Sequence, residues 1–385
     1  MKLKKSKILK FLLSIQSIIY INLFIKFSKI LNKDIKVVFF YFPVKSYQDN
    51  ILELIDEIKR EKNIKVILGY NFGSAKEVKD YDKAFFLNLG YLKYIKKVDI
   101  FLSSYVVYEF PESLNKIYIN HDIYDTPMVD VEKEKGLINT LNKCDYIFLS
   151  SDIAVSALQK KIDEYTLSKA FKKKPQLINT GYLKLDHVYK KLKNDNSVED
   201  SVLLAPTLSS MLTNYNLDEF LDPLINELLK NTSFKIIYRP HPVDKTNSVK
   251  NCNINNIYEK YKNNKNFTLD INSSYLDSYK KSKILITDFS GTAYTYSFSQ
   301  NKPVIFFSYN ENEIIKKELS KLNYFIDRKK IGYIVNNFTV LNQKLKKIQK
   351  NNILFGKKID KLKKIRIKNF GNSLKVTKKT IESML

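Results

Sequence analysis

The sequence has few of the residues that build metal sites and disulfide frameworks. Among its 385 residues there are only 2 cysteines and 3 histidines. Cys144 and Cys252 lie far apart and lack the close spacing of metal ligands, which indicates a protein of a reducing compartment. No two histidines have H-x-x-x-H or H-E-x-x-H spacing, so a histidine-rich metal site is excluded. This removes most metallohydrolase classes, and we expect no metal ion and no other cofactor.

Acidic residues are scarce relative to basic ones. The chain has 40 Asp and Glu against 66 Lys and Arg, a formal net charge of +26. This excess favours an anionic partner, either nucleic acid or an anionic membrane surface. The lysines are spread along the chain without a basic stripe interleaved with aromatic residues, and no nucleic-acid-binding motif is present. We therefore expect no nucleic acid partner.

Apolar residues are plentiful, at 44% with 26 Tyr and 24 Phe, which is typical of a globular protein. Continuous apolar runs of strand length recur in two series, separated by the polar stretch 190–200. Such runs fit strands buried on both faces, as in parallel sheets covered by helices. The first series predicts strands at 35–42, 64–70, 98–105, 116–121, 144–151 and 176–182. The second predicts strands at 201–207, 234–242, 266–271, 283–290, 302–308 and 331–337.

The predicted fold class is therefore α/β, with two doubly wound parallel-sheet, Rossmann-like domains facing a cleft. The length of the chain also favours two domains. We expect the first domain over residues 31–190 and the second over 200–360, followed by a C-terminal basic helix over 361–385.

The N-terminus combines the basic start MKLKKSK with an uncharged run of 15 residues, FLLSIQSIIYINLFI, at 11–25. This run is shorter than the roughly 20 residues that span a bilayer. No small-residue cleavage site of a secretory signal follows it. We expect residues 1–30 to form a basic amphipathic helix on the anionic inner face of the cytoplasmic membrane, so that the protein is cytoplasmic and peripheral. The alternative is an ordinary helix packed on its own domain.

Ligands of open α/β sheets bind beyond the carboxyl ends of the strands. Polar and special residues follow several of the predicted strands there: His121, Gly181, Thr207, Arg239, His241 and Ser290. We therefore expect the functional residues of both domains at these strand ends.

The stretch LITDFSGTAYTYSFSQNKPVIFF, residues 285–307, predicts a strand followed by a helix from about Ala293. Asp288, Ser290, Gly291 and Thr292 lie at the turn between them. A helix N-terminus preceded by glycine and small hydroxyl residues is an anion site that suits a pyrophosphate. The alternative is that Ser290 or Thr292 only caps the helix.

In YRPHPVD, residues 238–244, Arg239 offers a planar fork for phosphate oxygens, and His241 can donate to a phosphate or carry a proton. Pro240 and Pro242 fix the backbone around them. A surface histidine in a proline turn is the alternative.

His121 ends a predicted strand in YINHDIYDTPM, residues 118–128. Neighbouring Asp122 and Asp125 are expected to favour its imidazolium and orient it as a general base. A plain turn histidine is the alternative. We interpret His187 as structural and the DYD of residues 80–82 as a solvated face.

Five motifs carry a family resemblance: LLAPT, YRPHP, NTGYLKLD, ITDFSGTAYTYSFSQNKPVIFF and the tail FGNSLKVTKKTIESML. In content and order they resemble the CDP-glycerol glycerophosphotransferase family of teichoic acid and capsule synthesis, over about residues 95–385. Two departures are visible: HDIYDTP stands where that family has HGTP, and Phe370 stands where an acidic residue often precedes the glycine.

The resemblance implies a GT-B fold, with an N-terminal acceptor domain and a C-terminal nucleotide-donor domain. It implies transfer of glycerol phosphate from CDP-glycerol to a lipid-linked or glycan acceptor at the inner membrane face. The two functional histidines of the family fall on His121 and His241. An acceptor hydroxyl deprotonated by His121 would attack the β-phosphorus, while Arg239, His241 and the turn near Ser290 hold the phosphates and the leaving CMP. A nucleotide-sugar glycosyltransferase on the same fold is the alternative.

Overall fold

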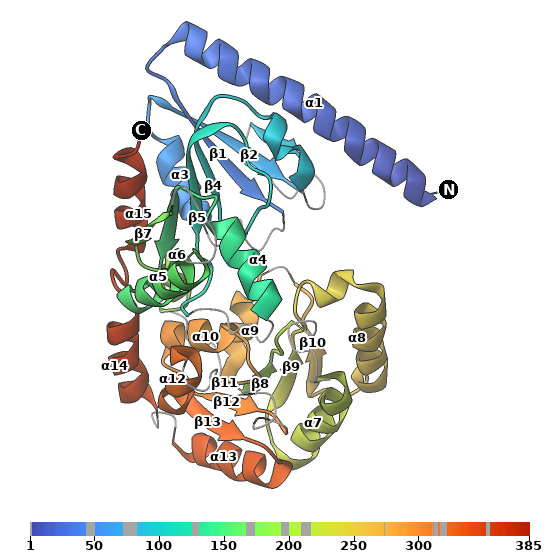
Figure 1. The fold of residues 1–385 in the computed structure, drawn as a ribbon. Coiled ribbons are helices and arrows are strands. Elements are labelled where there is room, and N and C mark those ends of the chain that lie inside the picture. Colours follow the sequence, from blue (N-terminus) through green and yellow to red (C-terminus); the bar gives the residue numbers. More distant parts are fainter. Residues whose placement is uncertain are drawn as a thin grey trace. The chain divides into compact units, whose positions relative to one another are not determined.

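The computed structural model describes residues 2–43, 51–71, 83–124, 131–166, 174–193, 200–208, 217–272, 274–309, 311, 315, 322–351 and 355–385 (Figure 1). The chain forms two compact units. Unit 1 comprises Met1–Asp122, Val131–His187 and Ile367–Leu385, and unit 2 comprises Ile123–Asp130 and Val188–Arg366.

Unit 1 contains a seven-stranded parallel sheet in the order β3-β2-β1-β4-β5-β6-β7. Strand β1, in the interior of the sheet, contributes Phe40 to the apolar cluster on one face and Phe39 to that on the other. Burial on both faces explains the unbroken apolar runs. The strands are β1 Lys36–Phe42, β2 Ile64–Tyr70, β3 Ala84–Phe86, β4 Val98–Ser103, β5 Ser113–Ile119, β6 Tyr146–Leu149 and β7 Gln176–Asn179.

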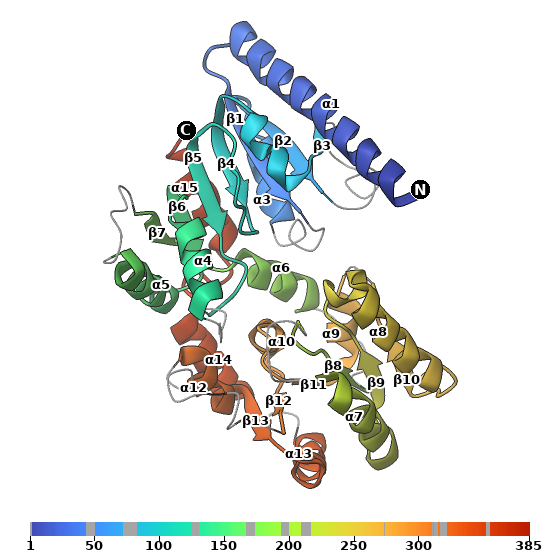
Figure 2. The same ribbon diagram turned by 45° about the vertical axis from the view of Figure 1, so that its right-hand side comes forward.

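Helices cover both faces of this sheet (Figure 2). Helix α15 packs on α3, and its Ile381 is fully buried in the core. The helices are α1 Lys2–Leu31, α3 Leu52–Lys59, η2 Leu89–Tyr94, α4 Val131–Leu141, α5 Asp152–Thr166, α6 Leu183–Leu192 and α15 Ser373–Glu382. Helix α6 continues past His187, so that its last residues, from Val188 to Leu192, belong to unit 2.

Helix α1 packs on β3 and η2 with its small polar side chains turned inward. Ser14, Ser17 and Ser28 are buried together with Ile21 and Ile25. Twelve large apolar side chains of the helix are exposed instead: Ile8, Leu9, Phe11, Leu12, Leu13, Ile15, Ile19, Tyr20, Leu23, Phe27, Ile30 and Leu31. This polarity is the reverse of that of a helix on the surface of a soluble domain.

Hydrogen bonds fasten the inward face of α1 to unit 1. The Asn22 side chain donates to Tyr94 O at 2.9 Å and accepts from Lys96 N at 2.8 Å. Nearer the start of the helix, Asn88 N donates to Ser14 Oγ at 3.2 Å. Lys29 pairs with Asp99 near the end, with 2.8 Å between Nζ and Oδ2.

The expectation that this N-terminal segment is too short to span a membrane is corrected. In the part of the chain that the structure describes, one helical stretch is long and apolar enough to do so, Ile8–Leu31, with mean hydropathy 1.9. The uncharged run counted from the sequence ends at Lys26, whereas the helix continues through that lysine to Leu31.

The tail of the chain closes unit 1 through a set of contacts that we name the C-terminal clasp: Gly181, Tyr182, Asp186, Gly371 and Ser373. Asp186 accepts from Gly371 N at Oδ1 and from Ser373 N at Oδ2, both at 2.8 Å. Ser373 Oγ accepts from Tyr182 N at 3.0 Å. Gly181 has a φ of +91°, and a Cβ there would lie 2.8 Å from the carbonyl oxygen of Lys368. Two motifs of the family resemblance, NTGYLKLD and FGNSLK, therefore form one structural contact.

Unit 2 contains a six-stranded parallel sheet in the order β10-β9-β8-β11-β12-β13. The order reverses between β8 and β11, so the carboxyl ends of these two strands form a topological switch point. The strands are β8 Ser201–Leu204, β9 Lys235–Tyr238, β10 Phe267–Leu269, β11 Ser282–Thr287, β12 Val304–Phe307 and β13 Gly332–Val335.

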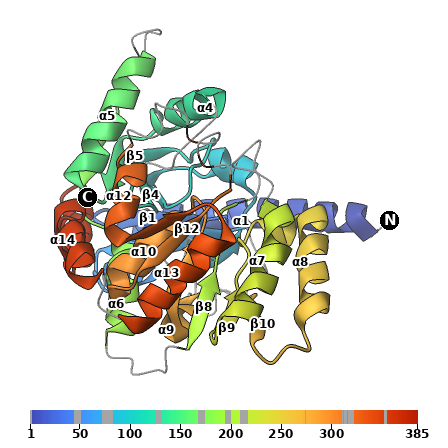
Figure 3. The ribbon, with the colours of Figure 1, turned by 90° about the horizontal axis from the view of Figure 1, so that it is seen from below.

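The core on one face of this sheet lies under α7, α8 and α13; Figure 3 shows α7 and α13 in front of the strands. The buried Tyr294, Tyr296 and Phe298 of α10 join the interior of the unit. The helices are α7 Leu217–Asn231, η4 Asp244–Thr246, α8 Ser248–Tyr261, α9 Leu276–Lys281, α10 Thr292–Gln300, α12 Asn323–Ile331, α13 Phe338–Lys350 and α14 Gly356–Arg366.

The predicted α/β class with two parallel-sheet units is confirmed, and each predicted strand run overlaps a strand. Only β3 was not predicted. The single basic helix expected over 361–385 is corrected: α14 ends at Arg366, and α15 begins at Ser373 in unit 1. Between them Asn369 and Gly371 have positive φ, which interrupts helical geometry.

Candidate active site

The switch point of unit 2 brings together predicted residues from two strand ends. Thr207 follows β8, and Asp288 follows β11 directly. Asp288 Oδ1 accepts from Thr207 N at 2.9 Å and from Phe289 N at 2.7 Å. Thr287 Oγ1 donates to Ala205 O at 2.6 Å and joins the same two loops. The two strand ends are therefore fixed against each other at the place where ligands of such sheets bind.

The start of α10 is partly exposed at Ser290, Gly291 and Thr292. Ser290 Oγ accepts from Thr292 N at 3.3 Å, so the serine hydroxyl satisfies the first amide of the helix, although the N-cap position itself is Gly291. The N–H groups of Ser290 and Gly291 have no hydrogen-bond partner among the described residues. Two open backbone donors at a helix N-terminus can bind an anion. Ser290 thus caps one amide of this turn while two others stay available.

Arg239 lies at the end of β9 with its guanidinium engaged. Nη1 pairs with Asp270 Oδ2 at 2.6 Å, and Nη2 donates to Asn272 O at 2.9 Å. Burial alone would raise the pKa of Asp270, but hydrogen bonds from Ser278, Asn272 and Arg239 and the Arg239 charge lower it overall. These contacts make Arg239 a tie between the ends of β9 and β10. Its direct contact with a phosphate stays a prediction.

Sequence reasoning missed Lys245, which lies in η4, the short helix that follows the YRPHPVD turn. Its Nζ donates to Ile271 O at 3.0 Å. Burial, followed by the nearby positive charge of Arg239, lowers the pKa of Lys245, while Asp270 partly opposes this shift. The position of this lysine directly after the motif was the only available signal.

His241 is partly exposed, and its ring orientation is set by its own turn. Val243 N lies 3.3 Å from His241 Nδ1 and donates to it, and Asp244 N donates to His241 O at 3.0 Å. An Nδ1 that accepts a hydrogen bond leaves Nε2 as the protonated nitrogen of the neutral ring. His241 is therefore prepared to donate a hydrogen bond through Nε2.

His121 follows β5 in unit 1 among aromatic side chains. Its Nδ1 lies 3.1 Å from the Tyr118 hydroxyl, and the Tyr182 hydroxyl donates to its backbone carbonyl. Burial lowers the pKa of His121; the Asp122 charge and a backbone hydrogen bond with Ser104 oppose the shift, and the Lys184 charge adds to it.

The expected imidazolium at His121 is therefore corrected, because burial outweighs Asp122. A neutral ring is the form that a general base needs. Asp125 and the DYD of residues 80–82 lie outside the described residues. His187 pairs with Glu53, with 3.1 Å between Nδ1 and Oε1, in keeping with a structural role.

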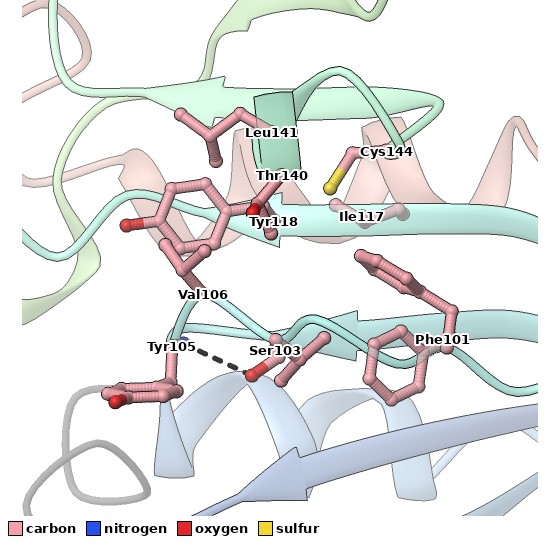
Figure 4. A pocket seen from close by; sticks show the side chains of 11 residues that line it. Phe101, Ser103, Tyr105, Val106, Ile117, Tyr118, Thr140, Leu141 and Cys144 are labelled. Carbon is pink, nitrogen blue, oxygen red and sulfur yellow. Dashed lines mark hydrogen bonds between the residues drawn. The ribbon is translucent and has the colours of Figure 1, made fainter. Parts of the chain in front are cut away.

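Beside His121, Tyr118 also lines a small pocket between β4, β5 and α4 (Figure 4). The pocket is mainly apolar, and Ser103 Oγ in its wall donates to Tyr41 O and accepts from Tyr105 N. Burial raises the pKa of the Cys144 thiol to about 12, so this cysteine stays protonated and is no nucleophile. The pocket offers packing around Tyr118 rather than reactive groups.

Tyr124, three residues after His121 in the chain, belongs to unit 2. Its hydroxyl donates to Asp327 Oδ2 at 2.7 Å, and its ring centroid lies 4.3 Å from that of Tyr294 in α10. Arg366 Nε also binds Asp327 Oδ2, at 2.6 Å. Sequence reasoning missed the contact between Tyr124 and Asp327, because the two residues are 203 positions apart.

No group of three or more His, Cys, Asp or Glu side chains among the described residues is arranged to hold a metal ion. The groups that could neutralise a phosphate in unit 2 are backbone amides, His241 and cationic side chains. The chemistry that this arrangement supports is anion binding.

Residues 199–332 match the model of the LIC12162 family transferases. Over 151 residues the chain is 33% identical to the minor teichoic acid biosynthesis protein GgaB of Bacillus subtilis (strain 168). This match covers 39% of the chain and 15% of that protein, so the chain spans less than a sixth of the length of the curated relative.

Among solved structures, the wall teichoic acid polymerase TagF is similar over 98% of this chain and 97% of its own, with a TM-score of 0.61 and 18% identity. A TagF structure soaked with CDPG has a TM-score of 0.60 at 16% identity, covering 99% and 98%. The S. aureus MnaA structure with UDP has a TM-score of 0.59 at 13% identity, covering 91% and 98%. The GT-B type of fold predicted from the sequence is confirmed, and the matches support the family resemblance.

Proposed function

We propose that the protein transfers a glycerol-phosphate unit from CDP-glycerol to a hydroxyl group of a lipid-linked or polysaccharide acceptor in cell-surface polymer synthesis, with release of CMP. The observation that carries the proposal is the α10 turn at the switch point of unit 2, with two open backbone amides beside partly exposed hydroxyl groups. The likeness to GgaB and to the TagF structure soaked with CDPG supports this donor and pathway.

In this scheme unit 2 binds the donor. The pyrophosphate accepts hydrogen bonds from Ser290 N and Gly291 N at the positive end of the α10 dipole. His241 donates to a phosphate oxygen through Nε2 and holds the charge that develops on the leaving CMP. Thr207 and Asp288 keep the two strand ends in place around this turn.

Unit 1 supplies the base. The neutral His121 ring removes the proton from the acceptor hydroxyl, and the oxygen attacks the β-phosphorus. The new bond joins this oxygen to the β-phosphorus, and the bond from the β-phosphorus to the bridging oxygen breaks, so that CMP leaves with the electron pair.

The alternative is a nucleotide-sugar glycosyltransferase of surface polysaccharide synthesis. It is favoured by the fold likeness to MnaA with UDP and to a Methanocaldococcus jannaschii UDP-GlcNAc 2-epimerase with UDP-GlcNAc and UDP, which has a TM-score of 0.54 at 14% identity.

A panel of CDP-polyols and UDP-sugars with lipid-linked acceptors tests both functions. We expect CMP release and a product heavier by one or more glycerol phosphates from CDP-glycerol alone. Ser290→Ala, which removes the hydroxyl beside the two open amides, should weaken CMP binding in calorimetry more than it lowers stability. Arg239→Ala should weaken CMP binding and also lower stability, because it leaves the buried Asp270 without its cationic partner. A product that carries a sugar from a UDP donor would replace the proposal with the alternative, and unchanged CMP affinity in both variants would remove the donor from this turn.

We also propose that α1 lies in the plane of an anionic membrane surface. Its apolar side chains point away from unit 1, and contacts from Ser14 to Lys29 dock its other face over roughly 22 Å of helix. A helix docked along this length cannot cross the hydrocarbon region without taking the charged Lys29–Asp99 pair and parts of unit 1 with it. Insertion of the exposed face as far as the acyl boundary, with lysines at the headgroups, buries the apolar side chains and leaves the docked face on unit 1.

Sedimentation with anionic liposomes tests this placement. Leu12→Glu with Leu23→Glu on the exposed face should lower the partition coefficient onto the liposomes by at least about 100-fold, since each buried leucine contributes about 1.5–3 kcal/mol. Asn22→Ala on the docked face is the matched control and should stay bound. Intact protein that remains in the supernatant at low salt would refute surface attachment. A double variant that stays bound and is released only by detergent would indicate a spanning helix.

A further inference from the structure

The two carboxylate oxygens of Asp288 have different surroundings. Oδ1 accepts two backbone hydrogen bonds, from Thr207 and from Phe289. Oδ2 is buried and has no hydrogen-bond partner among the described residues. The residue is only 2% exposed, so bulk water does not take the place of the missing partner. Because Oδ2 has almost no accessible surface, Asp288 holds the turn together rather than contacting a ligand.

A buried carboxylate oxygen without a partner disfavours the ionised form. Burial raises the pKa of Asp288 to about 6, although the hydrogen bonds to Oδ1 oppose the shift. The protonated form is therefore accessible close to neutral pH, and it would place the proton on Oδ2.

The ionisable groups on the elements around the turn leave Asp288 without a cationic partner. Tyr279 of α9 reaches Thr292 and stays neutral, since burial raises its pKa to about 12. Arg328 of α12 lies over the ring of Phe289 and pairs with Glu311. Arg239 at the end of β9 is paired with Asp270.

We propose that Asp288 is a positioning residue that holds the Thr207 loop against the α10 turn as a neutral carboxylic acid in the donor complex, so that binding of a nucleoside diphosphate ester takes up one proton from solution. The proposal rests on the proposed function, because it needs the pyrophosphate at this turn. An ionised Asp288 directly before the anion site would repel the two negative charges of the donor in a medium of low dielectric. Protonation of Oδ2 removes this repulsion, and Oδ1 keeps both backbone hydrogen bonds.

Calorimetric titration of the full-length protein with CDP-glycerol, without acceptor, tests the proposal at about pH 7 in two buffers of different ionisation enthalpy. CDP-glycerol is a suitable probe because its phosphodiester groups lack the second ionisation near pH 6 of a phosphomonoester. We expect uptake of about 0.5 to 1 proton by the wild type and less than about 0.2 by Asp288→Asn, whose side-chain oxygen can still accept at the Oδ1 position. His241→Asn is the matched control and should bind more weakly but keep the uptake.

The outcomes separate the two proposals. Absence of CDP-glycerol binding contradicts the proposed function. Binding without proton uptake, uptake that persists in Asp288→Asn, or uptake that disappears in His241→Asn overturns the role of Asp288 alone. Where Asp288→Asn folds poorly, the pH dependence of the wild-type Kd replaces it: we expect Kd to rise by up to about tenfold per pH unit between about pH 6.5 and 8, and a flat profile overturns the proposal.

Discussion

Asp186, which is half-buried, and Asp288, which is buried, show how differently the two units use the same side chain. Asp186 in the clasp of unit 1 accepts one backbone hydrogen bond at each carboxylate oxygen. Asp288 at the α10 turn of unit 2 accepts two backbone hydrogen bonds at Oδ1, whereas Oδ2 has no partner among the described residues. Burial raises the pKa of both. Both carboxylate oxygens of Asp186 in the clasp accept structural hydrogen bonds, whereas one carboxylate oxygen of Asp288 at the α10 turn has no partner among the described residues.

The difference indicates that one sequence motif can serve the structure of the protein and another the binding of a ligand. The clasp residues of NTGYLKLD and FGNSLK hydrogen-bond to each other, so stability explains these contacts, although Asn179 Oδ1 at the start of the first motif has no partner among the described residues. In ITDFSGT, by contrast, two backbone amides and one carboxylate oxygen have no partner among the described residues, a cost that a structural turn has no reason to carry. Variants in the clasp should therefore affect stability, and variants in the turn should affect ligand binding.

The largest effect on stability is expected for a substitution that disrupts the C-terminal clasp. Gly181→Ala should lower the free energy of unfolding by on the order of 3–5 kcal/mol, because φ is +91° and the new Cβ would contact Lys368 O at 2.8 Å. Urea denaturation measures the loss. Gly136→Ala, in helix α4 with nothing within 4 Å of its Cβ position, is the control and should be neutral or stabilising. A stability change below about 1 kcal/mol for Gly181→Ala would show that the clasp contributes little.

The next effect concerns the two histidines at strand ends. His121→Ala and His241→Ala should each lower turnover by on the order of 100-fold or more while the fold is retained. The rate of CMP release with a confirmed acceptor measures this. His187→Gln, which removes only the pair with Glu53, should keep most of the activity. Near-normal turnover in either alanine variant would exclude that histidine from the chemistry.

The comparison of the two aspartates predicts that the substitution of Asp by Asn changes stability in opposite directions at positions 186 and 288. Asp186→Asn should cost about 1–3 kcal/mol, because its NH2 group would face a backbone N–H. Asp288→Asn should stabilise the protein at pH 7.5 by up to about 3 kcal/mol, because the pKa of Asp288 is raised to about 6.

The sign of the second effect follows from linkage. A raised acid pKa contributes stability that is fully present below the unfolded value of about 4 and is lost as pH rises through about 6. The gain of Asp288→Asn should therefore be small at pH 4 and reach its full size above pH 6. Hydrogen exchange in β8 and β11 measures the change in stability of Asp288→Asn. Equal changes in stability for Asp186→Asn and Asp288→Asn would contradict the proposed difference between the clasp and the turn.

The smallest effect concerns Tyr118. Tyr118→Phe removes the hydroxyl at 3.1 Å from His121 Nδ1. A hydroxyl that donates to the neutral ring lowers its pKa, so its loss should move the acidic limb of the kcat/KM profile upward by about half a unit. Tyr182→Phe, which loses a bond to the His121 backbone carbonyl, should leave this limb in place. An unchanged limb in Tyr118→Phe would make Tyr118 a packing residue only.

The strands were predictable because burial on both faces produces unbroken apolar runs, as in β1 and β11. Strand β3 was missed because it has three residues, all partly exposed. The turn at Ser290 was visible because a helix start is encoded locally. The charge state of His121 was predicted wrongly, because Asp122 is a neighbour in sequence, whereas burial is a tertiary property. The Arg239–Asp270 pair joins residues 31 positions apart and has no local signal.

The discontinuity of unit 1 has a consequence for the order of events during synthesis. Helix α15 follows all of unit 2 in the sequence, yet its Ile381 is packed in the same cluster as Phe40 of β1. Unit 1 therefore cannot close its core until Ile381 has been translated, whereas all of unit 2 up to Arg366 has by then been made. Contacts of such long sequence separation form slowly, and an incomplete core exposes apolar surface. A nascent chain that stalls before the clasp is made is thus the state most exposed to aggregation and to chaperones.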